Sequence, residues 1–210
     1  MPVRRFFDME NPFWQGLSVI ADMMILNLLT LLCCAPLVTI GAALAAMNDV
    51  VIHIVRQEDS GILKSFGRAF RQNLKNGMLF SMILLIAMGL LYFDYICALT
   101  YAEMFRYGIA ALAILLLAIT IYTLALMARY ENRLGTTLKN AAVLAVGYFP
   151  QTLGMVCFTT AFWLLCIHFW RYGTPVLILF GFSLPCYVNI MLMRKMFQQL
   201  EKEKEDEGEA

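Results

Sequence analysis

Long apolar stretches alternate with short charged segments along the whole chain, and this pattern predicts helices that cross a membrane. One crossing needs about 20 mostly apolar residues. Stretches of that kind predict helices over about 17–34, 42–56, 77–97, 107–128, 141–167 and 173–193. We therefore expect an all-α fold, a polytopic transmembrane helical bundle of five to six spans that forms a single domain over residues 1–200.

Prolines mark where the longest apolar stretches bend or end. The first stretch covers 17–55, which is too long for one crossing, and Pro36 predicts a turn in its middle. The second half, 42–56, is short, so the sequence leaves open whether it crosses the membrane or re-enters it. Pro150 predicts a kink in the fifth stretch, where Gln151 could satisfy the backbone carbonyl that the kink frees.

The segment 62–75 has a different pattern, because its apolar and basic positions fall on opposite sides of one helix. Apolar side chains recur at spacings of three and four residues, as on the buried face of an amphipathic helix. This predicts a basic helix that lies at the membrane interface. Its candidate interfacial basic face consists of Lys64, Arg68, Arg71 and Lys75.

The basic residues also predict the orientation of the chain, because cytoplasmic loops carry an excess of Lys and Arg. With six crossings and a cytoplasmic N-terminus, fourteen of the sixteen basic residues lie inside, against twelve if 42–56 does not cross. The C-terminus is cytoplasmic in both arrangements. The acidic tail, 201–210, is expected to be solvated and disordered. We expect a multi-pass protein of the cytoplasmic membrane.

Composition excludes several classes of function. The chain is 61% hydrophobic and 15% charged, and its formal net charge of +1 gives no reason to expect a nucleic-acid partner, whereas the lipid bilayer is an expected one. It contains no phosphate-binding loop, no H-E-x-x-H, no G-x-S-x-G and no C-x-x-C. We therefore expect neither an enzyme nor a cofactor or metal site.

Polar residues within the first two predicted helices are the candidate site, because ionisable groups inside a membrane are costly. If these helices form a hairpin, the side chains could converge on one polar patch within the bundle. The alternative is structural: a hydrated carboxylate at the interface, a local ion pair and an amide that bonds a neighbouring helix. The candidate intramembrane polar patch is Asp22, Asn27, Asn48, Asp49 and His53.

Short motifs in the first 76 residues resemble a known family. They are Asn11-Pro12-Phe13, then Asp22 and Asn27-Leu28-Leu29, then Leu32-Cys33-Cys34-Ala35-Pro36-Leu37-Val38-Thr39-Ile40-Gly41-Ala42, then Ser65-Phe66, and finally Ala69-Phe70-Arg71-Gln72-Asn73-Leu74-Lys75. Together they resemble the YesL-like family of bacterial integral membrane proteins, and the later spans match in layout.

The activity of that family is not established, so the resemblance supplies no functional residues. Its members are often encoded beside ATP-driven carbohydrate uptake systems. The resemblance therefore implies, by association, an accessory or regulatory partner of a sugar permease or another membrane protein. The alternative is a small transporter or permease-like protein in its own right. The sequence leaves the ligand and the oligomeric state open.

Overall fold

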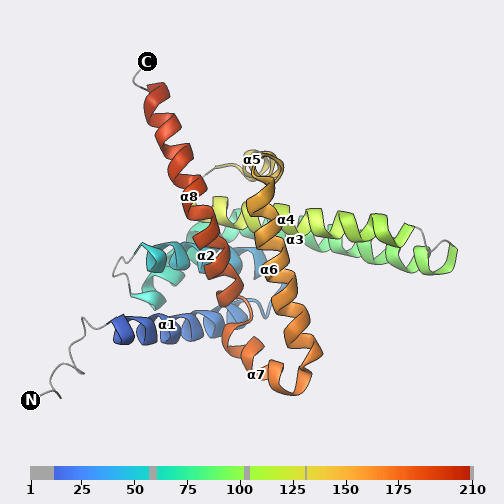
Figure 1. The fold of residues 1–210 in the computed structure, drawn as a ribbon, viewed down its shortest axis with the longest axis horizontal. Coiled ribbons are helices and arrows are strands. Elements are labelled where there is room, and N and C mark those ends of the chain that lie inside the picture. The colour runs from blue at the N-terminus through green and yellow to red at the C-terminus, as the bar shows by residue number, and fades with distance from the viewer. Residues whose placement is uncertain (1–11, 57–60, 102–104, 131, 209–210) are drawn as a thin grey trace, which may run out of the picture.

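The computed structural model describes residues 12–56, 61–101, 105–130 and 132–208. Within these ranges the chain is helical and contains no strand, which confirms the expected all-α bundle (Figure 1). The elements are α1 (Pro12–Cys33), η2 (Leu37–Thr39), α2 (Ile40–Val55), α3 (Ile62–Tyr101), α4 (Phe105–Arg129), α5 (Leu134–Gly147), α6 (Phe149–His168), α7 (Trp170–Phe180) and α8 (Ser183–Gly208). Arg4 and Arg5, which we expect on the cytoplasmic side, lie outside the described residues.

Five stretches within these helices are long and apolar enough to cross a membrane. A sixth follows if α7 and α8, which are bent by 58° at their junction, count as one broken span. The expected number of five to six spans is therefore confirmed for the described residues. The five stretches are Gly16–Cys33, Leu37–Val55, Ile62–Ala98, Tyr107–Arg129 and Phe149–His168.

The core consists of three clusters of buried apolar side chains. One surrounds Tyr122, where α4, α5, α6 and α8 meet. A second surrounds Phe66, where α1, α2, α3 and α8 meet. A third surrounds Phe80, where α2, α3, α4 and α5 meet. The helices of the first half and those of the second half therefore share one continuous bundle, linked by α2, α4 and α8.

The short helix α2 lies at the centre of this bundle, as Figure 1 shows. A helix that is apolar on all sides is typically buried, and most of α2 is buried by α1, α3, α4 and α8. Its small side chains allow neighbouring helices to approach closely. The buried residues are Gly41, Ala42, Ala43, Ala45, Ala46, Met47, Asn48, Val50 and Val51.

The closest approach within the bundle is between Gly41 of α2 and Gly77 of α3. A Cβ atom added to Gly41 would collide with the carbonyl oxygen of Gly77, and one added to Gly77 would collide with the backbone of Ala42. Ser81, one turn after Gly77, accepts a hydrogen bond from the backbone N–H of Gly41 at 2.7 Å and donates one to the carbonyl of Gly77 at 2.9 Å. The contact therefore joins the two backbones and also satisfies a donor in the first turn of α2.

The basic segment 62–75 is not a separate helix, which differs from our expectation. It is the first part of α3, a continuous helix of 40 residues. Nothing interrupts the helix at 76–77, because the segment contains no proline and Gly77 is held against α2. A helix of this length measures about 60 Å, whereas the hydrocarbon core of a bilayer is about 30 Å thick. Only part of α3 can therefore lie within hydrocarbon.

The far ends of α3 and α4 extend beyond the other helices, as Figure 1 shows. We call residues 85–97 of α3 and 107–115 of α4 the distal hairpin. None of its side chains is buried. Large apolar side chains are exposed on both of its helices, including Leu90 at 62% and Tyr107 at 82%. The described parts of the bundle therefore leave the distal hairpin largely uncovered.

The predicted helices 141–167 and 173–193 are each broken. We expected a kink at Pro150 in the first and one helix over the second. Tyr148 has φ −107° and ψ 51°, which ends α5, and α6 starts at Phe149 with Pro150 in its first turn. In Figure 1 α5 is seen end-on, whereas α6 is seen from the side and runs downward from α5 toward α7. The second break falls between Phe180 and Ser183, shortly before Pro185. Proline is tolerated in the first turn of a helix and clashes with the carbonyl four residues earlier, which explains both positions.

The acidic tail continues the last helix. The final helix, α8, continues to Gly208, so residues 201–208 are helical. Glu and Lys dominate this segment and both have high helix propensity, which explains why the helix continues. We expect this solvated helix end to fray into disorder, which stays a prediction, and 209–210 lie outside the described residues.

Gly77→Leu is expected to destabilise the folded protein by at least about 3 kcal/mol, because the side chain would push α2 away from α3. The matched control is Gly67→Leu, on the same helix, where a Cβ meets nothing within 4 Å. It should change stability by less than about 0.5 kcal/mol. Unfolding of purified protein in detergent, followed by circular dichroism during an SDS titration, measures both. Equal stability of the two variants would contradict the described contact.

Candidate functional site

The most extensively hydrogen-bonded of the predicted polar residues is Asn27, which is completely buried on α1. Its side-chain amide donates to the carbonyls of Leu177 at 3.3 Å and Ile178 at 2.7 Å, both in the last turn of α7. Its carbonyl oxygen accepts from the backbone N–H groups of Phe182 at 2.8 Å and Ser183 at 3.1 Å. One side chain therefore satisfies both ends of the α7–α8 break, where backbone groups lose their partners within the helices.

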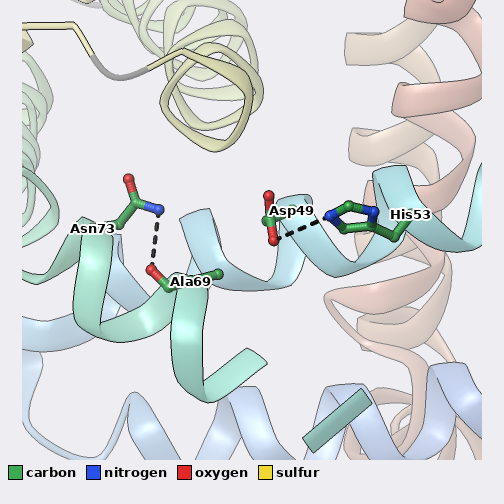
Figure 2. A network of polar contacts seen from close by, with 4 residues as sticks. All are labelled: Asp49, His53, Ala69 and Asn73. Carbon is green, nitrogen blue, oxygen red and sulfur yellow. Dashed lines mark hydrogen bonds and ion pairs between the residues drawn. The ribbon is translucent and has the colours of Figure 1, made fainter. Parts of the chain in front are cut away.

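The other polar residues of the predicted patch lie along α2 and α1. Asn48 donates to the carbonyl of Leu44 at 2.8 Å, within its own helix. Asp49 and His53, four residues apart on α2, form an ion pair at 3.8 Å when His53 is protonated, as Figure 2 shows. The side chains of both are partly exposed, at 26% and 35%. Asp22 is partly exposed on α1.

The predicted patch therefore divides into two places. The contacts of Asn27 lead to α7 and α8, whereas the contacts described for Asn48, Asp49 and His53 run along α2. The neighbouring turn of α3 adds a second polar contact, in which Asn73 donates to the carbonyl of Ala69 at 3.1 Å (Figure 2). Arg68 of α3 also interacts electrostatically with Asp49 across the α2–α3 contact.

The predicted basic face lies on the first part of α3, and all four of its side chains are exposed. The opposite side of the same turns is buried, with Phe66 at 2% and Ala69 at 3% exposure in the core. Near the end of the basic face, the side chain of Asn76 donates to the carbonyl of Asn132 at 3.2 Å. That hydrogen bond joins α3 to the connection between α4 and α5.

Several polar residues with structural roles were not identified from the sequence. At the α5–α6 break, the Thr152 hydroxyl lies 3.0 Å from the carbonyl oxygens of Ala145 and Tyr148 and 3.0 Å from the Tyr122 hydroxyl. We expected the side-chain amide of Gln151 to donate to these carbonyls, but the Thr152 hydroxyl lies there instead. The side-chain oxygen of Gln151 is buried and has no hydrogen-bond partner among the described residues. The signal was present, because a hydroxyl in the turn after a proline can bond the preceding carbonyls.

The contact between α6 and α8 contains further buried polar groups. Asn189 of α8 donates to the Thr159 hydroxyl of α6 at 3.2 Å. The side-chain oxygens of Asn189, and of Ser183 at the α7–α8 break, are buried and have no hydrogen-bond partner among the described residues. Buried polar groups without partners are uncommon in folded proteins. The α6–α8 contact is therefore a further place, besides the two helix breaks, where polar groups lie within the apolar bundle.

The cysteines and acidic residues show no arrangement for redox or metal chemistry within the described residues. All six cysteines are free thiols. Burial, with a smaller effect of neighbouring Cys33, raises the pKa of the Cys34 thiol to about 11, so it stays protonated at neutral pH. Across the described ranges, no group of three His, Cys, Asp or Glu side chains could hold a metal ion.

The fold defines a class: the chain is a multi-pass α-helical membrane protein. Residues 23–95 match the model of a family described as a protein of unknown function, DUF624. The matched segment contains the second half of α1, all of α2 and most of α3, and so includes the Gly41–Gly77 contact and the basic face. No curated protein and no solved structure matches the chain.

Asn27→Ala is expected to destabilise the protein by about 2–4 kcal/mol, because it leaves buried backbone groups at the α7–α8 break without partners. The matched control is Asn73→Ala, which removes a single hydrogen bond within α3. It should lower the free energy of unfolding by about 1 kcal/mol or less. SDS titration of both variants measures the difference. Trp163 packs against Phe182 with ring centroids 5.4 Å apart, so its fluorescence should change in the first variant only. Equal losses in the two variants would show that Asn27 does not hold the break.

Proposed function

We propose that this chain is a non-enzymatic accessory protein of the bacterial cytoplasmic membrane, which binds another membrane protein through the distal hairpin. The observation that carries this proposal is the distal hairpin itself. Its two helices are apolar, extend beyond the bundle and have no buried side chain among the described residues (Figure 1). The described residues of the other helices do not cover this surface, so the helices of a partner have access to it.

Glycines on the distal hairpin favour a protein partner in addition to lipid. Helices in a bilayer associate mainly through close packing, for which small residues are needed. Gly41 and Gly77 serve that purpose within the chain. Gly89 of α3 and Gly108 of α4 have nothing within 4 Å of the position that a Cβ would take, so no contact within the chain explains them. Each leaves a shallow depression in which a partner helix can lie close.

The resemblance to YesL-like proteins supports a partner of one class, a permease for carbohydrate uptake. The match to a family of unknown function over residues 23–95 is compatible with this assignment. The distribution of basic residues supports a cytoplasmic location of both termini. In that orientation the basic face of α3 is cytoplasmic, and the distal hairpin extends into and across the bilayer.

A small transporter is the second candidate, and the α7–α8 break favours it. Transporters often place their substrate at the ends of broken helices. Here Asn27 already bonds those helix ends, so a substrate would have to displace or extend these bonds. Uptake of labelled mono- and disaccharides into vesicles that contain only this protein, with loss of uptake in Asp22→Asn or Asp49→Asn, would establish this alternative.

The accessory role is tested by affinity purification of the tagged protein from its native membrane in mild detergent, with mass spectrometry of the proteins recovered. The wild-type protein is expected to recover a permease subunit. Gly89→Leu should reduce that recovery at least about tenfold, which corresponds to a loss of about 1.4 kcal/mol in binding. Its own stability should not fall, because the added side chain meets nothing within this chain.

The matched control is Gly135→Leu, an equally open position on α5, away from the distal hairpin. It should recover as much permease as the wild-type protein. If the wild-type protein recovers no membrane partner, the accessory role is wrong. If Gly89→Leu recovers as much as the control, the partner binds somewhere other than the distal hairpin.

A further inference from the structure

One line of side chains along α3 changes from basic to apolar in the middle of the helix. Positions 64, 68, 71, 75, 79, 82 and 86 lie within an arc of about 80° around an ideal helix. The first four are the exposed cations of the basic face. The last three are apolar and also exposed: Leu79 at 55%, Met82 at 47% and Ile86 at 61%. A single exposed line of the helix therefore presents positive charge at one end and apolar surface at the other.

The apolar part of this line is about as long as one leaflet of the hydrocarbon core is thick. From Lys75 to Ile86 the helix rises by about 16 Å. Half of the hydrocarbon core of a bilayer is about 15 Å thick. If Ile86 lies near the centre of the bilayer, Lys75 therefore lies at the level of the lipid headgroups, with Arg71 one turn further out. Lys64 and Arg68 lie further from the hydrocarbon.

A second element brings another cation to the same level. Asn76 donates to the carbonyl of Asn132 at 3.2 Å, which places the α4–α5 connection beside the end of the basic face. Lys75 and Arg133 are the immediate neighbours of these two residues along the chain. Arg133 is exposed, like Arg71 and Lys75. Cations from two separate segments therefore lie at one level of the bundle.

Few acidic groups are present to neutralise these cations. Residues 62–93 of α3 contain no Asp or Glu. Asp49 of α2 interacts electrostatically with Arg68, which, like Lys64, lies further from the hydrocarbon than Arg71 and Lys75 do. Glu131 precedes Asn132 in the sequence and lies outside the described residues. Arg71 and Lys75 form no salt bridge with a described residue, and their charge is available to a ligand.

We propose that Arg71, Lys75 and Arg133 bind the headgroup phosphate of an anionic phospholipid, whose acyl chain lies along Leu79, Met82 and Ile86. Cations near a membrane surface attract anionic headgroups. An acidic protein segment would use the charges alone, whereas a phospholipid also covers the apolar line that continues from them. The combination of both on one face of α3 favours the lipid. This inference does not depend on the accessory role, because its cations lie outside the distal hairpin and only Ile86 belongs to both surfaces.

The test is native mass spectrometry of the full-length protein in mild detergent, with added phosphatidylglycerol or with phosphatidylcholine of the same acyl chains. The wild-type protein should bind phosphatidylglycerol more tightly. The triple variant R71Q/K75Q/R133Q should lose roughly tenfold or more in affinity for phosphatidylglycerol, because each cation contributes roughly fivefold near a membrane surface. Its affinity for phosphatidylcholine should not change.

The matched control is K64Q/R68Q/K139Q, which removes three other exposed cations from α3 and α5. Its affinity for phosphatidylglycerol should fall by less than roughly threefold. Equal affinity of the two triple variants would overturn the proposal, because the charge would then act without a defined site. Displacement of the lipid by inorganic phosphate, or stronger binding of polyglutamate than of phosphatidylglycerol, would also overturn it and would assign the surface to free phosphate or to an acidic protein.

A measurement on the wild-type protein does not depend on folding of the variants. At high ionic strength, screening should remove most of its preference for phosphatidylglycerol over phosphatidylcholine. A preference that does not change with salt would contradict a headgroup site built from exposed cations.

Discussion

The contact between Gly41 and Gly77 determines where α2 lies against α3, and the other helices are arranged around that pair. Within a bilayer, apolar side chains gain nothing by leaving lipid for protein, so helices associate where their backbones can approach closely. Here two glycines without side chains allow direct contact, and the Ser81 hydroxyl adds hydrogen bonds to both helices. Since α2 contributes to two of the three core clusters, its position determines how α1, α4 and α8 pack.

The same physical requirement explains the buried polar residues at the helix breaks. Backbone groups freed at a break need partners, because lipid supplies none. Asn27 supplies them at the α7–α8 break from a helix 150 residues away in sequence. Thr152, whose hydroxyl also contacts that of Tyr122, does so between α5 and α6, and Ser81 does so at the start of α2. Polar side chains within these spans thus maintain the fold in a bundle whose remaining contacts are mostly apolar.

The sequence predicted the features that depend on local composition and missed those that depend on distant contacts. Apolar length and Pro36 predicted the number of spans and the first turn correctly. The separate basic helix was wrong because continuity at Gly77 depends on its contact with α2, which no local pattern encodes. Pro150 indicated a kink but not its extent. Asn27 was recognised as unusual, yet its partners on α7 and α8 are far away in the sequence, so spacing alone could not identify them.

The continuity of α3 has a mechanical consequence. A helix without an interruption moves as a rigid rod, and α2 holds this one at Gly77, near its middle. A rotation of about 10° at that point would move Ala98 by about 5 Å, because about 31 Å of helix separates the two residues. The N-terminal part of α3 would move in the opposite direction. A change in what the N-terminal end of α3 contacts is therefore converted, without any change in secondary structure, into a displacement of its C-terminal end.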